Sequence, residues 1–479
     1  MQPGLIRIIA KQEIKTIFRE RVSWILYLIL VGISVVAVYT GWSYVKQFNK
    51  QQVAAKNEVT KHWMNQPERH PHRVAHYGYL VFREKSPLSF FDYGLDSYVG
   101  NSVFLEAHRQ NTVNMSEAGF SNGMLRFGEL SMAMVLQMLV PLFIIFIGFH
   151  TVAGLKQSGV LKILLCQRAS YFDILIGKTV GLTLVAWLLF LPLILLSLLF
   201  GIGASVGELT SDIFLRSLLV LLTYAAYLFV ISVFVTGISA ISKSAGNALI
   251  SLVLFWILFC VVIPKSAQTL GNRLFTAPDK IAFESAIEDA ISKEGDSHNP
   301  DDPHFAQLKA STLRKYGVDS ISQLPVNYGA LVMQEGENIS SGIFSSHFDQ
   351  LINTYKSQNR VSSLLSLIDP YLGIRNISMN LSGTDFETFT EFQKQTEKYR
   401  FDKTKKINEI HLTQIRFKND RDQKVSSKNW QEQADFRFQP VSVQTNLLNS
   451  LLSLGALLFW IVAGVGALKY ISSKQEYQL

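Results

Sequence analysis

Four histidines and one glutamate lie close together in the first long polar part of the chain, and these side chains suit a metal ion best. Imidazole and carboxylate groups are common zinc ligands, and a His-Pro-His sequence can turn two rings toward one centre. However, the chain has no His-Glu-x-x-His motif, and this region holds no cysteine. The sequence therefore favours a hydrogen-bonded corner with Tyr77 and Asp92, and predicts no resident metal. The five residues are His70, His72, His76, Glu106 and His108.

A second stretch, Gly177-Lys178-Thr179, has the residues that end a phosphate-binding loop. Such a loop requires a glycine five positions before its last glycine, where this chain has Phe172. The stretch also leads directly into an apolar segment. We therefore expect no ATP hydrolysis by this chain, no enzymatic activity and no bound cofactor.

The histidine cluster and the Gly-Lys-Thr stretch lie between or beside segments that are mostly membrane spans. The chain has 479 residues, 48% of them hydrophobic, and six apolar stretches are free of Asp, Glu, Lys and Arg. Each is long enough to cross roughly 30 Å of hydrocarbon at about 1.5 Å per residue. The sequence thus predicts an all-α polytopic membrane protein. The expected spans are 22–44, 131–153, 179–204, 217–241, 247–264 and 446–468.

The basic residues beside these spans predict the orientation. With both termini in the cytoplasm, the cytoplasmic pieces hold 12 basic and four acidic residues, a surplus equal to the +8 net charge of the chain. The positive charge is therefore a sign of topology and gives no reason to expect a nucleic acid partner. Residues 1–21 are expected to form an amphipathic elbow helix in the cytoplasmic interface, and 469–479 a cytoplasmic tail.

Two long polar insertions remain outside, and we expect two large, mainly helical extracytoplasmic domains at 45–130 and 265–442. Helical patterns run over 344–367 and 385–415, and Gly383-Thr384-Asp385 should end one helix and cap the next. The only cysteines are Cys166 and Cys260, so no disulfide holds either domain together.

Residues 154–178 form the longest expected cytoplasmic piece between spans. Leu155, Val160, Leu161, Leu164 and Leu165 recur there at helical spacing, with basic residues between them. We expect a short helix that offers an apolar edge to another protein.

Few polar side chains lie within the expected spans, and such groups usually face a bundle interior or a cavity. They are candidates to line a substrate path, while helix packing is an equally open interpretation for the two tyrosines. Proline removes a backbone hydrogen bond, so Pro141, Pro192 and Pro264 are expected to kink their helices. The candidate path residues are Gln137, Tyr224, Tyr227, Asn446 and Asn449.

Three stretches, 70–111, 158–178 and 369–400, give the chain a family resemblance. With the order of spans and insertions, it resembles a type 2 ATP-binding-cassette (ABC) exporter permease, of a bacterial subfamily with two large extracytoplasmic insertions. The resemblance implies an inner-membrane permease whose 154–178 segment is a coupling helix. This chain has Leu155 and Gln157 where the family usually has an acidic pair, and Val160 in place of threonine.

The resemblance also implies the partners. A cytoplasmic ABC ATPase dimer would bind ATP and Mg and push the coupling helix, and a second permease subunit, identical or a sister chain, would complete the path. A periplasmic or outer-membrane component is a further expected partner. The implied ATPase contacts are Lys156, Gln157, Ser158, Gly159, Val160, Leu161, Leu164 and Gln167.

Two other functions stay open from the sequence. One is an ATP-driven mechanotransmission complex, which acts on an envelope partner without moving substrate through the membrane. The other is a membrane-held metal enzyme that uses the histidine cluster.

Overall fold

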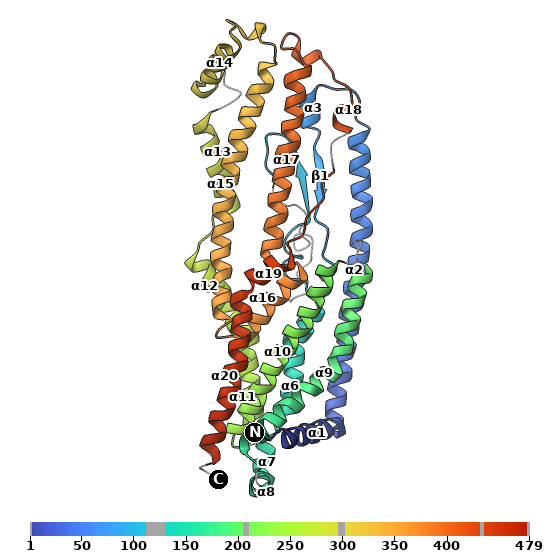
Figure 1. Cartoon of the computed structure of the whole chain (residues 1–479), viewed down its shortest axis with the longest axis vertical. Coiled ribbons are helices and arrows are strands. Elements are labelled where there is room, and N and C mark those ends of the chain that lie inside the picture. The colour runs from blue at the N-terminus through green and yellow to red at the C-terminus, as the bar shows by residue number, and fades with distance from the viewer. Residues whose placement is uncertain are drawn as a thin grey trace.

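The six apolar stretches are helices that pack side by side in one half of an elongated molecule (Figure 1). The computed structural model describes residues 2–111, 130–167, 169–204, 210–295, 302–431 and 435–476. In this part of the chain six helical segments are long and apolar enough to cross a membrane, which confirms a mainly helical multi-pass membrane protein. We call this half of the molecule the bundle.

The bundle contains three uninterrupted span helices besides α2, and two spans that contain a wider π-helical turn. The uninterrupted helices are α9 (Tyr171–Ala204), α10 (Ser211–Ile241) and α20 (Leu451–Glu476), and α2 is Arg21–Met64. The second span is α5 (Met132–Met134), η2 (Val135–Leu139) and α6 (Val140–Gly148), and the fifth is α11 (Ala245–Ile257), η3 (Leu258–Val262) and α12 (Ile263–Leu274).

The two π-helical turns explain how prolines fit into these spans. Each turn ends two residues before a proline, Pro141 after η2 and Pro264 after η3. A proline has no N–H to donate, and its ring crowds the preceding turn, so a wider turn relieves both constraints. Pro192 lies within α9, which runs through it without interruption.

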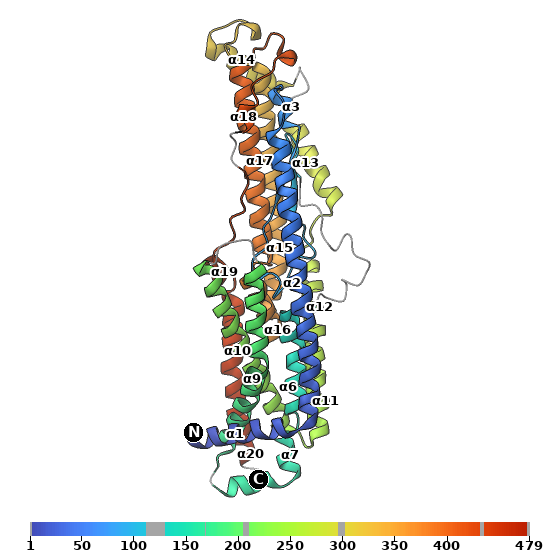
Figure 2. The ribbon, with the colours of Figure 1, turned by 90° about the vertical axis from the view of Figure 1, so that its right-hand side faces the viewer.

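Helix α1 (Pro3–Arg19) lies across the end of the bundle and packs against α9 (Figure 2). Two glycines of α9 permit this close approach, because a Cβ at Gly177 or Gly181 would lie 2.7 Å from a side-chain carbon of α1. Lys178 forms an ion pair with the buried carboxylate of Glu13, which also accepts a hydrogen bond from Thr151. The Gly-Lys pair of the apparent phosphate loop therefore joins α1 to α9.

The described residues of the two insertions pack together in the other half of the molecule, around a shared hydrophobic core. We call the described residues of 45–130 and 275–442 the distal domain. Its core combines Trp63 and Tyr79 of the first insertion with Phe392 and Trp430 of the second, and the Trp63 indole donates to the Trp430 carbonyl over 2.9 Å. Neither insertion buries these aromatic side chains by itself, which is why the two fold together.

The described part of the first insertion is less helical than expected. After α2, which continues to Met64, it holds α3 (Pro71–Ala75) and an antiparallel hairpin of β1 (Tyr79–Phe82) and β2 (Ser102–Leu105), with Tyr79 paired to Leu105. Between β1 and β2 the chain follows turns. The hairpin packs between α2 and the helices of the second insertion (Figure 1).

The second insertion is helical, as expected, and its long helices run parallel to α2 (Figures 1 and 2). The helices are α13 (Lys280–Glu294), α14 (Pro303–Tyr316), η4 (Ile321–Gln323), α15 (Tyr328–Leu365), α16 (Pro370–Ser382), α17 (Phe386–Gln414), η5 (Asp420–Asp422) and α18 (Lys428–Gln431).

Helix α16 fixes the distal domain to the bundle. Its apolar side chains Ile374, Ile377 and Leu381 are buried in the bundle core between α10 and α20. Gly383, at φ +68°, ends α16, and the Asp385 side chain accepts the Glu387 N–H at the start of α17. This confirms the stop and cap predicted from Gly383-Thr384-Asp385.

The last span begins later than the apolar run suggests. A separate short helix, α19 (Val443–Asn449), precedes α20, and the chain turns at Ser450. Asn446 and Asn449 therefore belong to α19 and not to the span helix.

Candidate functional site

The end of the bundle opposite the distal domain carries a helical turn between the second and third spans. Helices α7 (Ala153–Gln157) and α8 (Val160–Cys166) meet there and lie beyond α1 (Figure 1). Gly159, at φ +74°, makes the turn between them. A residue with a Cβ is strained in this conformation, so glycine is the residue that suits the position.

The predicted coupling residues divide into an outward and an inward group. Gln157, Ser158, Gly159, Val160 and Gln167 are exposed. Leu161 is buried in the chain's own core with Tyr171 and Leu468, Leu164 packs partly against the same cluster, and the Lys156 amino group donates to the Ala240 carbonyl. The outward group is the part that a partner can contact.

Sequence reasoning missed the most exposed apolar side chain of this turn, Ile163. It is 59% exposed, against 38% for Val160 one helical turn earlier. The spacing of Val160, Ile163 and Gln167 places the three on one face of α8, and this spacing could have revealed it. We call Val160, Ile163 and Gln167 the α8 face.

Hydrogen bonds tie this turn to the neighbouring spans. The Gln157 side-chain oxygen accepts the Ala245 N–H, 3.2 Å away, at the start of α11. The Ser239 hydroxyl of α10 accepts the N–H groups of Val152 and Ala153 over 3.1 and 3.0 Å. These hydrogen bonds connect the α7–α8 turn to both α10 and α11.

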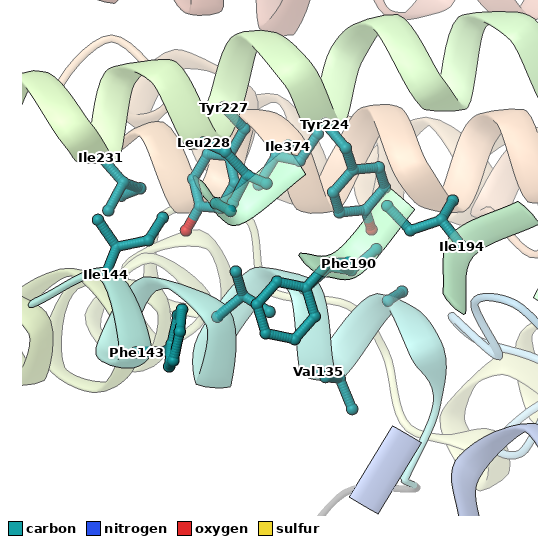
Figure 3. Packing of buried hydrophobic residues seen from close by; sticks show 14 of the residues in the cluster. Val135, Phe143, Ile144, Phe190, Ile194, Tyr224, Tyr227, Leu228, Ile231 and Ile374 are labelled. Atoms are coloured by element: carbon teal, nitrogen blue, oxygen red, sulfur yellow. The ribbon is translucent and has the colours of Figure 1, made fainter. Parts of the chain in front are cut away.

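The polar residues of the second and fourth spans form a closed network. Gln137 donates to the Tyr224 hydroxyl over 2.8 Å, and this hydroxyl lies 2.9 Å from that of Ser378 on α16. Ser378 donates to Asp92 over 2.5 Å, and Tyr227 donates to the Gln137 carbonyl over 2.8 Å. We call these five residues the junction network. Figure 3 shows Tyr224 and Tyr227 pointing from α10 toward the helix that carries Val135 and Phe143.

Every member of the junction network is buried and has a hydrogen-bond partner. Burial raises the pKa of Asp92, while hydrogen bonds from Ser378 and the Gly94 N–H favour its ionised form. Within one chain these groups join the bundle to the distal domain. Asp92 thus bonds to Ser378 and Gly94 and not, among the described residues, to the histidines with which the sequence grouped it.

The other two candidate path residues, Asn446 and Asn449, are not part of the junction network. The Asn446 amide donates to the Asn380 carbonyl over 2.8 Å and is buried between α19 and α16, whereas Asn449 is exposed.

A cavity of about 540 Å³ lies at the side of the distal domain, next to the bundle. It is bounded by α2, β1, the start of α10 and the segment after Asp435. The Arg216 guanidinium, at one edge, donates to the carbonyls of Leu381 and Val441 over 3.2 and 2.6 Å. Nothing in the sequence pattern indicated this cavity.

The histidines of the first insertion fall into two groups in the distal domain. The ring nitrogens of His72, His76 and His108 lie within 4.8 Å of one another, and we call these residues the histidine triad. Burial and the neighbouring rings of His76 and His108 lower the pKa of His72 to about 4, so its ring is neutral at pH 7.

His70 belongs to the second group, with His411 and Asp420. His411 Nε2 lies 2.8 Å from a carboxylate oxygen of Asp420, and the Asn327 amide donates to the same oxygen. Burial opposes ionisation of Asp420, but its hydrogen bonds with His411 and Asn327 prevail and lower the pKa.

Glu106 belongs to neither group. Its carboxylate accepts a hydrogen bond from Asn111 over 3.3 Å, and its backbone pairs with Arg109. Sequence reasoning missed Glu337, whose buried carboxylate accepts the His108 N–H over 3.0 Å and pairs with Arg400 over 2.5 Å. Burial raises the pKa of Glu337, but its contacts with His108 and Arg400 outweigh this and lower the pKa to about 2.

Residues 280–439 match the model of a domain of unknown function, DUF3526. This segment covers α13 to α18 and includes Glu337, Arg400 and His411. No curated protein matches the chain.

Proposed function

We propose that this chain is the membrane-spanning permease subunit of an ATP-driven ABC exporter in a bacterial inner membrane. The observation that carries the proposal is the α7–α8 turn, which presents the exposed α8 face at the end of the bundle and is tied by hydrogen bonds to α10 and α11. A separate ATPase dimer, which binds ATP and Mg, would contact this face. The basic residues near this end favour a cytoplasmic position for it.

The proposed coupling runs from the α8 face into the bundle. Closure of the ATPase dimer would displace α8, and the contacts of Gln157 and Ser239 would pass the displacement to α11 and α10. The π-helical turns η2 and η3 are points where the second and fifth spans can bend, because their hydrogen bonds depart from the regular α-helical pattern. ATP hydrolysis is thereby converted into movement of the spans.

The substrate path is proposed to form between two permease subunits. The apolar windows of α2, of the fifth span and of α20 are only 28%, 17% and 28% buried within one chain. These spans therefore have apolar surface that lipid or a second subunit can cover. The polar side chains of the junction network, by contrast, bond to one another within one chain. The mate is an identical or a sister chain.

The test uses the full chain co-expressed with its cognate ABC ATPase. We expect Ile163→Asp to weaken co-purification and nucleotide-stimulated transport at least about tenfold, because a carboxylate would be desolvated in the contact. Ile281→Asp is the matched control, since Ile281 is 80% exposed on α13 in the distal domain. Unchanged binding by the Ile163 variant, or ATP hydrolysis by the isolated chain, contradicts the proposal.

The same chain offers a check of its orientation. Cys166 at the end of α8 is exposed and Cys260 is buried. A membrane-impermeant maleimide should therefore label Cys166 in inside-out vesicles and not in spheroplasts. Labelling only in spheroplasts would place the α8 face on the wrong side for an ATPase.

A second candidate function is an ATP-driven machine that moves its distal domain against an envelope partner and transports nothing. The continuity of α2 favours it, since its 44 residues form one rod of about 66 Å from the bundle into the distal domain. ATP-dependent movement of the distal domain without substrate flux in proteoliposomes would select this function over export.

A further inference from the structure

We propose that His72, His76 and His108 bind a divalent transition-metal ion, with zinc as the preferred ion. The site lies in the distal domain at its end away from the bundle, where α3 packs against α17 (Figure 1). This inference is independent of the proposed export function.

The backbone brings the three rings together. His72 lies in α3 and His76 caps its end, one helical turn later, so the two rings share one face. The ring centroids are 4.6 Å apart for His72 and His76, 5.3 Å for His76 and His108, and 5.8 Å for His72 and His108. Three imidazoles on one tetrahedral zinc, with Zn–N of about 2.0–2.1 Å, have centroids on the order of 5 Å apart. Small side-chain rotations therefore suffice to close the site.

His108 is held in an unusual conformation that aims it at the other two. Its φ of +63° is uncommon for a residue other than glycine, and such conformations persist where the surroundings enforce them. The enforcing group is Glu337, which accepts the backbone N–H of His108 over 3.0 Å and lies 3.4 Å from its ring Nδ1.

The pairing of His108 with Glu337 resembles the hydrogen bonding that surrounds the ligands of zinc sites. Metal-bound histidines commonly donate their second ring nitrogen to a carboxylate, which fixes the ring orientation. Because Nδ1 lies 3.4 Å from Glu337, His108 would bind the metal through its Nε2 atom. Glu337 is itself fixed by Arg400, and all atoms of its side chain are buried.

One ring nitrogen of the histidine triad is also left without a hydrogen bond in the described part of the chain. His72 Nδ1 is buried and has no hydrogen-bond partner among the described residues. In the second histidine group, His70 uses its Nδ1 to accept the His72 N–H over 3.2 Å, which fixes the first turn of α3. His70 Nε2 and His411 Nδ1 of that group are likewise buried with no hydrogen-bond partner among the described residues, so the experiment must distinguish the two groups. A bound ion would satisfy the triad, and the second histidine group supports the helix that carries it.

The donor set defines the class of ion. Three imidazole nitrogens suit zinc, copper or nickel, whereas calcium and magnesium require oxygen ligands. Three protein ligands leave one tetrahedral position, as in zinc sites that bind water or a substrate group. Because His76 is exposed, this position is accessible from solvent.

The experiment uses the full chain in detergent, stripped with chelator and then titrated with ZnCl₂ against a chromophoric competitor. We expect one zinc per chain, and His76→Ala and His108→Ala should each weaken binding at least about 100-fold. His62→Ala, at an exposed histidine of α2 paired with Glu58, is the matched control and should bind as the wild type does. Cobalt loading should give the intense visible absorption of a tetrahedral site in the wild type and lose it in both triad variants.

Two results would overturn the proposal. One is the absence of zinc binding at micromolar concentration by the folded wild type. The other is binding by His76→Ala equal to that of the wild type, which would assign the ion to His70, His411 and Asp420. His76 is exposed, so its variant is expected to fold, and elution as a single species in size-exclusion chromatography verifies this.

Discussion

The junction network and the histidine triad are both clusters of polar side chains, but they differ in whether the protein itself satisfies them. At the junction, each of Gln137, Tyr224 and Ser378 bonds to another member, and the cluster joins α16 to the bundle. In the triad the rings converge on one another, and His72 Nδ1 has no partner among the described residues. Hydrogen bonds that satisfy one another indicate structural support, whereas converging rings with a buried nitrogen that lacks a partner indicate a ligand.

The largest effect is expected from the group that supports the triad. Arg400→Met leaves the Glu337 carboxylate buried without its cation, and such a loss costs about 3–5 kcal/mol in the free energy of unfolding. Chemical unfolding in mixed micelles measures this. The double variant Glu337→Gln, Arg400→Met should be less destabilised than Arg400→Met alone, and a purely additive result would mean that the pair is not coupled.

A smaller effect is expected at the junction. Tyr224→Phe removes the hydroxyl between Gln137 and Ser378 and leaves a buried amide with one partner fewer, at a cost of about 1–3 kcal/mol. Thermal unfolding in detergent should show the loss, and transport by the folded fraction should persist. Unchanged stability together with abolished transport would instead assign Tyr224 to the substrate path and contradict its structural role.

The smallest effect is expected at the triad without metal. His76 is exposed, so His76→Ala in the presence of chelator should change the free energy of unfolding by less than about 0.5 kcal/mol. The same unfolding measurement as for Tyr224→Phe permits a direct comparison. A loss as large as that of Tyr224→Phe would show that the histidines support the fold as the junction residues do.

Local patterns in the sequence determined much of the architecture. Charge-free apolar runs located the six spans, because each helix must satisfy its own backbone hydrogen bonds and remain apolar. The amphipathic pattern gave α1, and Gly383 with Asp385 gave the boundary between α16 and α17. Each of these features depends on residues a few positions apart.

The tertiary structure alone decided which distant residues meet. The Trp63–Trp430 bond joins residues 367 positions apart, and it reflects a core that neither insertion completes by itself. The contact between His108 and Glu337 spans 229 positions, so no spacing rule could have shown that a buried carboxylate orients this ring. Helical and apolar periodicity is encoded locally, whereas the satisfaction of a buried polar group depends on partners that only the folded chain brings within hydrogen-bond distance.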